Sequence, residues 1–254
     1  MPPIAPRVLP EYAVDKALPR LDALLGIMAE KNQPSIDTNF VRYLPGKTTL
    51  FERMKRKIIF LHGFFASGAC APARVLRQYF EGKAEVLAPD LPAHPRQAIA
   101  LLQQLCDEEH PDLLVGNSNG SFLGQIVASI NGLPALLGNP HLAMTEFLTA
   151  RIGLHEYKTP RADGNQQLRI DQPLIDEFAD LQLHQWDHCR EENRDRVWGL
   201  FGEHDQVAHY ESLFREHYPN VYHFPGAHAP SEEEVRSYYA PLAEQLLDRY
   251  ARER

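Results

Sequence analysis

The pentapeptide Gly116-Asn117-Ser118-Asn119-Gly120 has the residue types and the spacing that a nucleophilic serine requires. It comes directly after an apolar run and directly before a segment with helical periodicity. A serine in a sharp turn between a strand and a helix has strained backbone, and glycines two residues away on each side relieve the crowding. The pattern therefore predicts Ser118 as a nucleophile and Gly116 and Gly120 as the glycines of its turn. The alternative is a glycine-rich turn in which the serine is incidental.

A serine hydroxyl attacks a carbonyl group only when a base takes its proton, and that base needs an acid to orient it. Two loops farther along the chain supply both groups. Asp205 follows the apolar run RVWGLFG, and His228 follows the run NVYHF. Because parallel strands end at one edge of a sheet, both side chains should lie at the edge where Ser118 emerges. We predict Asp205 as the acid and His228 as the base, with Glu203 as the alternative acid.

Acyl transfer also needs two backbone N–H groups that point at the oxyanion which develops on the carbonyl oxygen. We predict the amide of Asn119, the residue after the nucleophile, as one donor, because it lies at the positive end of the following helix. The second donor should come from the loop after the first strand of the core, LHGFFAS. His62-Gly63 allows a tight turn there, and the Phe64 amide is the predicted donor. The alternative is that this loop is an ordinary strand exit.

The other histidines compete poorly with His228 as the base, although the chain has 12 of them. His223 alternates with Tyr222 and Phe224 inside an apolar run, which indicates a structural position in a strand. His204 and His209 precede the place in the chain that the base should occupy.

A metal site is not predicted. His184 and His188 form an H-x-x-x-H pair near Cys189, and such a pair could bring two imidazoles to one face of a helix. No glutamate completes an H-E-x-x-H pattern and no further ligand is evident, so we interpret these residues as structural or exposed. The chain also has no glycine-rich phosphate loop and no dinucleotide fingerprint, so no cofactor is expected.

Two other loops carry polar residues that we interpret as structural. Asp90 and His94 follow the run EVLAP at the end of a predicted strand. Asn139-Pro140 follows the run PALLG, and we interpret it as a stop for that strand that could also help to position the serine loop.

The elements that must position these residues form an alternating pattern. Short apolar runs alternate with amphipathic segments, as expected for a mostly parallel sheet with helices on both faces. The predicted strands cover residues 57–61, 85–89, 112–116, 134–138, 196–202 and 220–224. The predicted helices cover residues 72–80, 95–109, 121–131, 210–217 and 232–252, the last with Ser231 as its N-cap. The sequence therefore predicts an α/β fold with a sheet of about six or more strands.

Two segments interrupt this alternation. Residues 139–194 are too long for an ordinary loop and carry helical patches at 142–152 and 173–185, which predicts a small helical cap over the sheet. Residues 1–50 differ in character, with a helical stretch followed by an irregular one, so we predict an N-terminal extension there and a main domain over residues 51–254.

Composition and charge exclude several other classes. The chain has 254 residues, of which 44% are hydrophobic and 24% charged, so it can bury a core and is neither disordered nor collagenous. Its formal net charge of −8 argues against a general nucleic-acid surface. No apolar run is long enough to span a membrane, and no signal peptide is visible, so we expect a cytoplasmic protein. Its 3 cysteines have neither disulfide nor metal spacing.

The segments LHGFFAS, APDLPAHP, GNSNGS, GNP, LFGEHDQV and GAHA occur in this order along the chain. Together they resemble the α/β-hydrolase superfamily, and most closely its YqiA-like esterases. The resemblance extends over about residues 57–250. It implies hydrolysis of carboxylic esters or thioesters, with Ser118, Asp205 and His228 as the catalytic triad. The chain departs from the usual pattern at Asn119, where such families often have Leu or Met, and this makes the floor of the pocket more polar.

The sequence therefore predicts a serine hydrolase that cleaves a small or medium carboxylic ester or thioester through an acyl-enzyme on Ser118. Its expected partner is a small-molecule substrate rather than a nucleic acid or a membrane. One alternative is an amide or peptide hydrolase with the same triad. Another is a non-catalytic binding protein on a hydrolase scaffold, which could recruit a partner through residues 1–50.

Overall fold

Six parallel strands form the central sheet in the computed structural model of the protein, which describes residues 55–250. The strand order across the sheet is β2-β1-β3-β4-β7-β8. The strands are β1 (Arg56–Leu61), β2 (Ala84–Leu87), β3 (Leu113–Asn117), β4 (Ala135–Gly138), β7 (Val197–Gly202) and β8 (Asn220–Phe224). Each predicted strand is present with its ends shifted by at most two residues, and the predicted α/β fold is confirmed.

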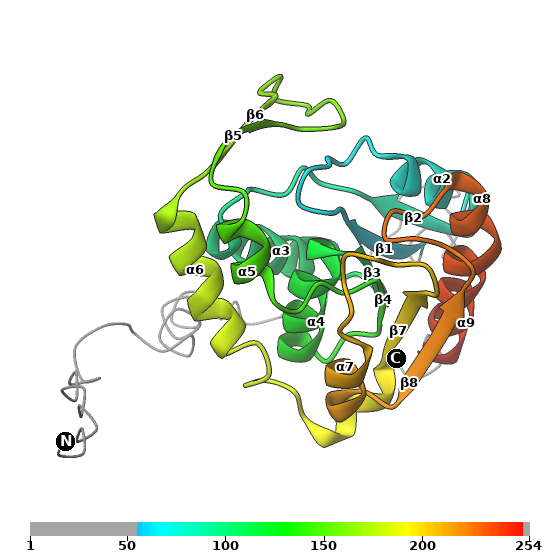
Figure 1. The fold of residues 1–254 in the computed structure, drawn as a ribbon. Coiled ribbons are helices and arrows are strands. Elements are labelled where there is room, and N and C mark those ends of the chain that lie inside the picture. The colour runs from blue at the N-terminus through cyan, green and yellow to red at the C-terminus, as the bar shows by residue number, and fades with distance from the viewer. Residues whose placement is uncertain (1–54, 251–254) are drawn as a thin grey trace, which may run out of the picture. The chain divides into compact units, whose positions relative to one another are not determined.

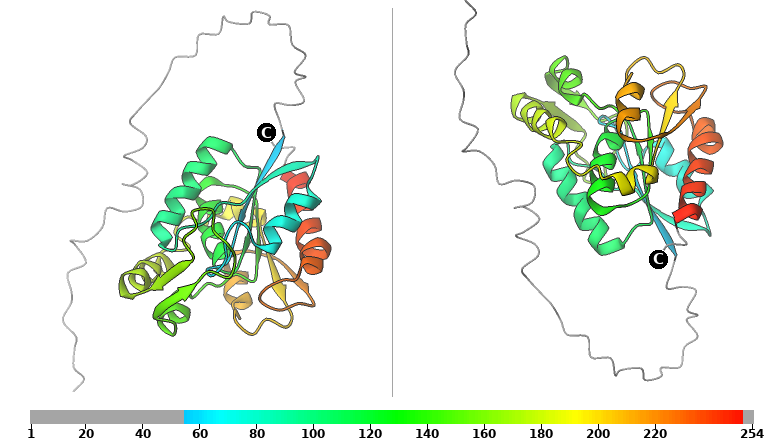
Figure 2. Two further views of the ribbon diagram at one scale, coloured as in Figure 1. Left: turned by 90° about the horizontal axis from the view of Figure 1, so that it is seen from above. Right: turned by 90° about the horizontal axis from the view of Figure 1, so that it is seen from below.

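Helices cover both faces of this sheet (Figure 1). In β1, Ile58 and Phe60 pack with one group of helices, whereas Ile59 and Leu61 pack with the other. The first group comprises α2 (Ala71–Tyr79) and α9 (Ala240–Tyr250), and the second comprises α3 (Pro95–Glu109), α4 (Asn119–Asn131) and α7 (Glu211–His217). In Figure 2, α2 and α9 lie on one side of the sheet and α3 on the other. Because both faces are covered, the inner strands β1, β3, β4 and β7 contain continuous buried runs, whereas the edge strands β2 and β8 each have an exposed residue.

The insertion between β4 and β7 contains a hairpin as well as helices. Its elements are α5 (Met144–Thr149), β5 (Gly153–Glu156), β6 (Gln167–Ile170), α6 (Gln172–Leu183) and the 3₁₀ helix η2 (Glu191–Arg196). The two predicted helical patches are present but shorter than expected. Strands β5 and β6 pair antiparallel as a separate two-stranded sheet, which projects from the body in Figure 1. The predicted helical cap therefore also contains a hairpin, which sequence reasoning missed because two strands of four residues each carry too little periodicity to be recognised.

The C-terminal helical segment consists of three parts. It begins with α8 (Glu232–Glu234), continues as a π-helical turn η3 (Val235–Tyr239) and ends as α9. The predicted N-cap is confirmed, because Ser231 Oγ accepts from the Glu234 amide at 3.2 Å and the Glu234 carboxylate accepts from the Ser231 amide at 2.6 Å. The π turn carries the fully buried Tyr239, whose hydroxyl donates to Asn117 Oδ1 at 2.9 Å, one residue before Ser118.

The predicted N-terminal extension, residues 1–50, lies outside the described residues. Within residues 55–250, no helix is both long and apolar enough to cross a membrane.

Candidate functional site

Ser118 lies in the turn between β3 and α4, at the carboxyl edge of the sheet. Its φ of 57° and ψ of −119° lie outside the ordinary regions for a non-glycine residue. The turn is tightly packed, since a Cβ at Gly116 would lie 2.7 Å from the Gly120 carbonyl oxygen, and a Cβ at Gly120 would lie 2.0 Å from that of Leu61. Both glycines of this turn are therefore required, because a Cβ at either position would overlap with backbone atoms.

His228 hydrogen-bonds to both Ser118 and Asp205. Its Nε2 lies 2.7 Å from Ser118 Oγ, and its Nδ1 lies 2.8 Å from Asp205 Oδ2. Because an ionised carboxylate only accepts, the Nδ1–H donates to Asp205 and leaves Nε2 free to accept from the serine hydroxyl. The structure thus brings together three side chains from the loops after β3, β7 and β8. Glu203, the alternative acid, is exposed, and its carboxylate hydrogen-bonds to neither Ser118 nor His228.

Asp205 is held in the charged form that this arrangement needs. Burial would raise the pKa of the Asp205 carboxyl, but hydrogen bonds from His228 and from backbone amides outweigh it, so the pKa lies below its ordinary value. The amides are those of Val207 and Ala208, which donate to Oδ1 at 2.7 and 3.1 Å. One carboxylate oxygen therefore fixes the acid loop, and the other orients His228.

Asn139 holds the histidine loop, a role that sequence reasoning missed. Its side-chain amide donates to the carbonyls of Ala227 and His228 at 2.9 and 3.0 Å. Its Oδ1 accepts from the Gly202 amide at the end of β7, at 2.7 Å. The backbone of Asn139 has a φ of 41°, in the left-handed region where asparagine is tolerated better than most residues. The Asn-Pro pair after an apolar run was the only sequence signal for this position.

The loop after β1 lies against Ser118. A Cβ at Gly63 would be 3.5 Å from Ser118 Cβ, which places the Gly63–Ala66 turn beside the nucleophile. The amides of Phe64 and Asn119 donate no backbone hydrogen bond to another described residue outside the regular helices and strands. Asn119 is the first residue of α4, where an amide has no partner within the helix. The assignment of these two amides as oxyanion donors stays a prediction.

The β5–β6 hairpin anchors this same loop from outside. Beyond the end of β5, the Lys158 amide donates to the Phe65 carbonyl at 2.8 Å. The Asp90 carboxylate accepts from the Gly68 amide with one oxygen and from the Ala162 amide with the other, both at 2.7 Å. Asp90 therefore has the structural role that its place after β2 indicated.

His62 is buried and braces the same loop in its neutral form. Its Nε2 accepts from the Leu91 amide at 2.9 Å, and its Nδ1–H donates to the Gly63 carbonyl at 2.9 Å. Burial lowers the pKa of His62 from 6.5 to about 4. The unfolded chain binds a proton at this ring near pH 6.5 and the folded chain only near pH 4, so stability falls as the pH falls between these values.

We therefore expect the free energy of unfolding to decrease by about 2 kcal/mol because of His62 when the pH is lowered from 7 to 5. His62→Gln should show a correspondingly smaller loss over this range in urea titrations. His184→Gln is the matched control, because His184 is exposed and pairs with Asp187 at 2.9 Å. An equal loss in the wild type and in His62→Gln would contradict the assignment.

The predicted structural histidines and cysteines take no part in this site. His223 pairs with Glu211 at 2.8 Å, and His184 pairs with Asp187 at 2.9 Å. All three cysteines are free thiols. Among residues 55–250, no group of three or more His, Cys, Asp or Glu side chains is placed to hold a metal ion.

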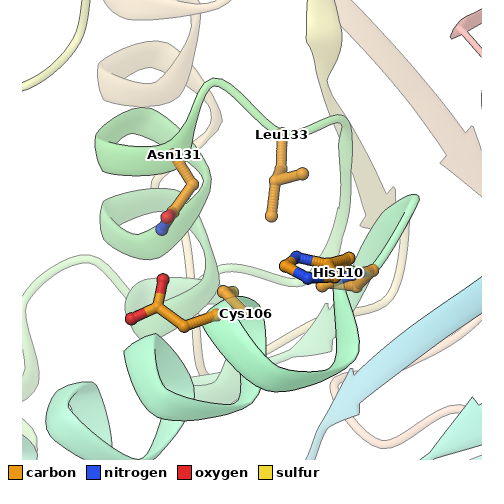
Figure 3. Close-up of a pocket in the computed structure, with 6 residues that line it drawn as sticks. Cys106, His110, Asn131 and Leu133 are labelled. Atoms are coloured by element: carbon orange, nitrogen blue, oxygen red, sulfur yellow. The ribbon is translucent and has the colours of Figure 1, made fainter. Parts of the chain in front are cut away.

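A surface cavity of about 330 Å³ lies at the opposite, amino edge of the sheet. Figure 3 shows Cys106, His110, Asn131 and Leu133 around it, from the ends of α3 and α4 and the loops that follow. Burial raises the pKa of Cys106 to about 12, so its thiol is not a nucleophile at neutral pH. None of the residues that line this cavity belongs to the Ser118 site.

Comparisons with solved structures identify the fold. The esterase domain of a Rhodothermus marinus protein matches with a TM-score of 0.57 and 15% identity, over 76% of this chain and 87% of that one. A monoacylglycerol lipase from Paleococcus ferrophilus matches with a TM-score of 0.55 and 14% identity, over 76% and 94%. The mouse α/β hydrolase domain-containing protein 10 matches with a TM-score of 0.55 and 15% identity, over 76% and 90%.

A family model matches a large part of the sequence itself. The model of an uncharacterised protein family, UPF0227, matches residues 57–224, a segment that includes Ser118 and Asp205. The α/β-hydrolase fold that the sequence resemblance implies is confirmed. The chain therefore belongs to the uncharacterised protein family UPF0227 and has the α/β-hydrolase fold.

Proposed function

We propose that this protein is a serine hydrolase that cleaves a small or medium carboxylic ester or thioester through an acyl-enzyme on Ser118. The observation that carries the proposal is the continuous hydrogen-bonded path from Ser118 Oγ through His228 to Asp205, with distances of 2.7 and 2.8 Å. A serine hydroxyl paired in this way with an oriented imidazole is activated for attack on a carbonyl carbon.

The reaction proceeds in two halves. Ser118 Oγ attacks the carbonyl carbon while His228 Nε2 takes the hydroxyl proton, and a tetrahedral oxyanion forms. His228 then gives that proton to the leaving alcohol or thiol, whose bond to the carbonyl carbon breaks. Water attacks the resulting acyl-enzyme with His228 as base again, and the free acid leaves as the serine regains its proton. Asp205 keeps the imidazole in the required tautomer throughout and stabilises its charged form.

The oxyanion is stabilised by the amides of Phe64 and Asn119. The position of Asn119 at the start of α4 adds the positive end of the helix to the second of these donors. Losing one such donor typically raises the barrier by about 3 kcal/mol. The contacts that anchor the Phe64 loop, through His62 and Asp90, therefore support catalysis by keeping this donor in place.

The comparisons favour an ester over an amide as the substrate. The similar structures include a monoacylglycerol lipase and an esterase domain, and both of these names denote enzymes that act on esters.

A cytoplasmic location is also part of the proposal. The three cysteines are free thiols, as expected in a reducing compartment.

The test is covalent labelling of the serine with a fluorophosphonate probe. Labelling of the wild type and loss of labelling in Ser118→Ala are expected, together with loss of hydrolysis of a short-chain p-nitrophenyl ester. Ser237→Ala, which removes an exposed hydroxyl on the C-terminal helix, is the control and should be labelled normally. Equal labelling of Ser118→Ala and the wild type would overturn the proposal.

A further inference from the structure

Two residues in backbone contact with Ser118 each have a buried polar side-chain atom with no hydrogen-bond partner in the part of the chain that the structure describes. These atoms are Asn119 Oδ1 and His141 Nδ1. The two residues are only 4% and 3% exposed. Leaving a buried polar atom unpaired typically costs about 1–3 kcal/mol, so most such atoms in folded proteins have a partner. The proposed reaction mechanism uses neither side chain.

His141 is placed against the reacting groups. Its amide donates to the Ser118 carbonyl at 3.4 Å. Its ring is nearly perpendicular to that of His228, with centroids 6.3 Å apart, and it packs between Phe147 and Tyr210 at 4.8 and 5.2 Å. The imidazole is therefore held in one place, next to the base.

His141 is also uncharged at neutral pH. Burial lowers its pKa to about 4, and the nearby His228 acts in the same direction. A neutral imidazole has one nitrogen that donates and one that accepts. This ring is thus suited to hydrogen bonding with an uncharged polar group rather than to acid–base chemistry.

Asn119 restricts the kind of group further. Its unpaired atom is a carbonyl oxygen, which can only accept a hydrogen bond. A matching substrate atom must therefore donate. A hydroxyl group can donate to Asn119 Oδ1 and also exchange a hydrogen bond with His141, which an aliphatic chain cannot do.

We propose that the substrate carries a hydroxyl group close to the scissile ester bond and that Asn119 and His141 recognise it. The proposal rests on the hydrolase function proposed above and specifies the substrate class of the same site. The polar residue at position 119 is then a specificity determinant for hydroxylated esters.

Two pairs of esters test this proposal. Methyl butyrate is compared with methyl 3-hydroxybutyrate, which places the hydroxyl on the acyl side, and ethyl butyrate with 2-hydroxyethyl butyrate, which places it on the alcohol side. Each kcat/KM is divided by the rate constant for alkaline hydrolysis of the same ester, which removes intrinsic reactivity. In at least one pair the wild type should prefer the hydroxylated ester by about tenfold or more, because an ester without the hydroxyl group leaves buried polar groups of the protein unpaired.

The variants Asn119→Leu and His141→Phe should each reduce this preference several-fold, and the separate measurement of kcat and KM shows whether binding or turnover changes. His184→Phe, which removes an exposed histidine, should keep the full preference. Hydrolysis of all four esters without preference would overturn this inference alone, as would an unchanged preference in both site variants. Absence of hydrolysis of every ester would overturn the proposed function as well.

Discussion

Replacing Asp205 by asparagine is expected to lower kcat/KM at neutral pH by about 10,000-fold, or about 5 kcal/mol in barrier, while the fold is retained. Asp205 Oδ1 accepts from two loop amides, those of Val207 and Ala208. The asparagine carbonyl oxygen can keep both bonds, so its NH₂ group must face His228 Nδ1. That group donates and forces Nδ1 to accept, which moves the imidazole proton to Nε2. A protonated Nε2 cannot take the proton of Ser118.

The measurement is kcat/KM for a short ester at pH 7, with thermal unfolding of both proteins as the check on the fold. Glu203→Gln is the matched control, because Glu203 lies two residues away in the same loop but is exposed. Its activity should stay within about twofold of the wild type, as expected for a surface carboxylate that touches no reacting group. A comparable loss in Glu203→Gln, or retention of a tenth of the activity in Asp205→Asn, would show that the acid is assigned to the wrong residue.

The central sheet could be predicted because its strands are buried on both faces. A strand such as β1 then contains a continuous apolar run, and the residues Ile58 to Leu61 are all at most 1% exposed. The helix ends could be predicted where a proline or a capping side chain marks them. Pro95 begins α3 at the predicted residue, and Ser231 caps α8 through its side chain.

The β5–β6 hairpin could not be predicted because its contacts are distant in sequence. Leu154 on β5 is 58% exposed, so this strand lacks the apolar alternation that normally identifies one. The hairpin instead depends on contacts with the loop after β1, such as the bond from the Lys158 amide to the Phe65 carbonyl. A local sequence pattern carries no information about such a contact.

The order of the site loops could be predicted, but the contacts that hold them could not. Ser118, Asp205 and His228 each follow an apolar run, and the topology of parallel sheets brings such loops to one edge. Asn139 binds residues 63 and 88 positions away in the chain. Those bonds exist only because β4, β7 and β8 are adjacent in the sheet, and strand order was not predicted.

Replacing Gly120 by alanine is expected to destabilise the fold by at least about 3 kcal/mol, a loss typical of severe overpacking. A Cβ there would lie 2.0 Å from the Leu61 carbonyl oxygen and 2.8 Å from that of His62. These are backbone atoms at the end of β1, so no side chain can move aside to make room. Helix α4 would have to move away from β1, and this would displace Ser118 and the Asn119 amide together.

Gly124→Ala is the matched control, because Gly124 lies one turn later in the same helix. There the nearest atom to an added Cβ is Leu137 Cδ2, the end of a flexible side chain, at 3.1 Å. The helical preference of alanine over glycine, up to about 1 kcal/mol, should offset this contact. Urea unfolding should therefore place Gly124→Ala within about 1 kcal/mol of the wild type and Gly120→Ala well below both. Equal stabilities of the two variants would mean that the close approach of α4 to β1 does not require a glycine at position 120.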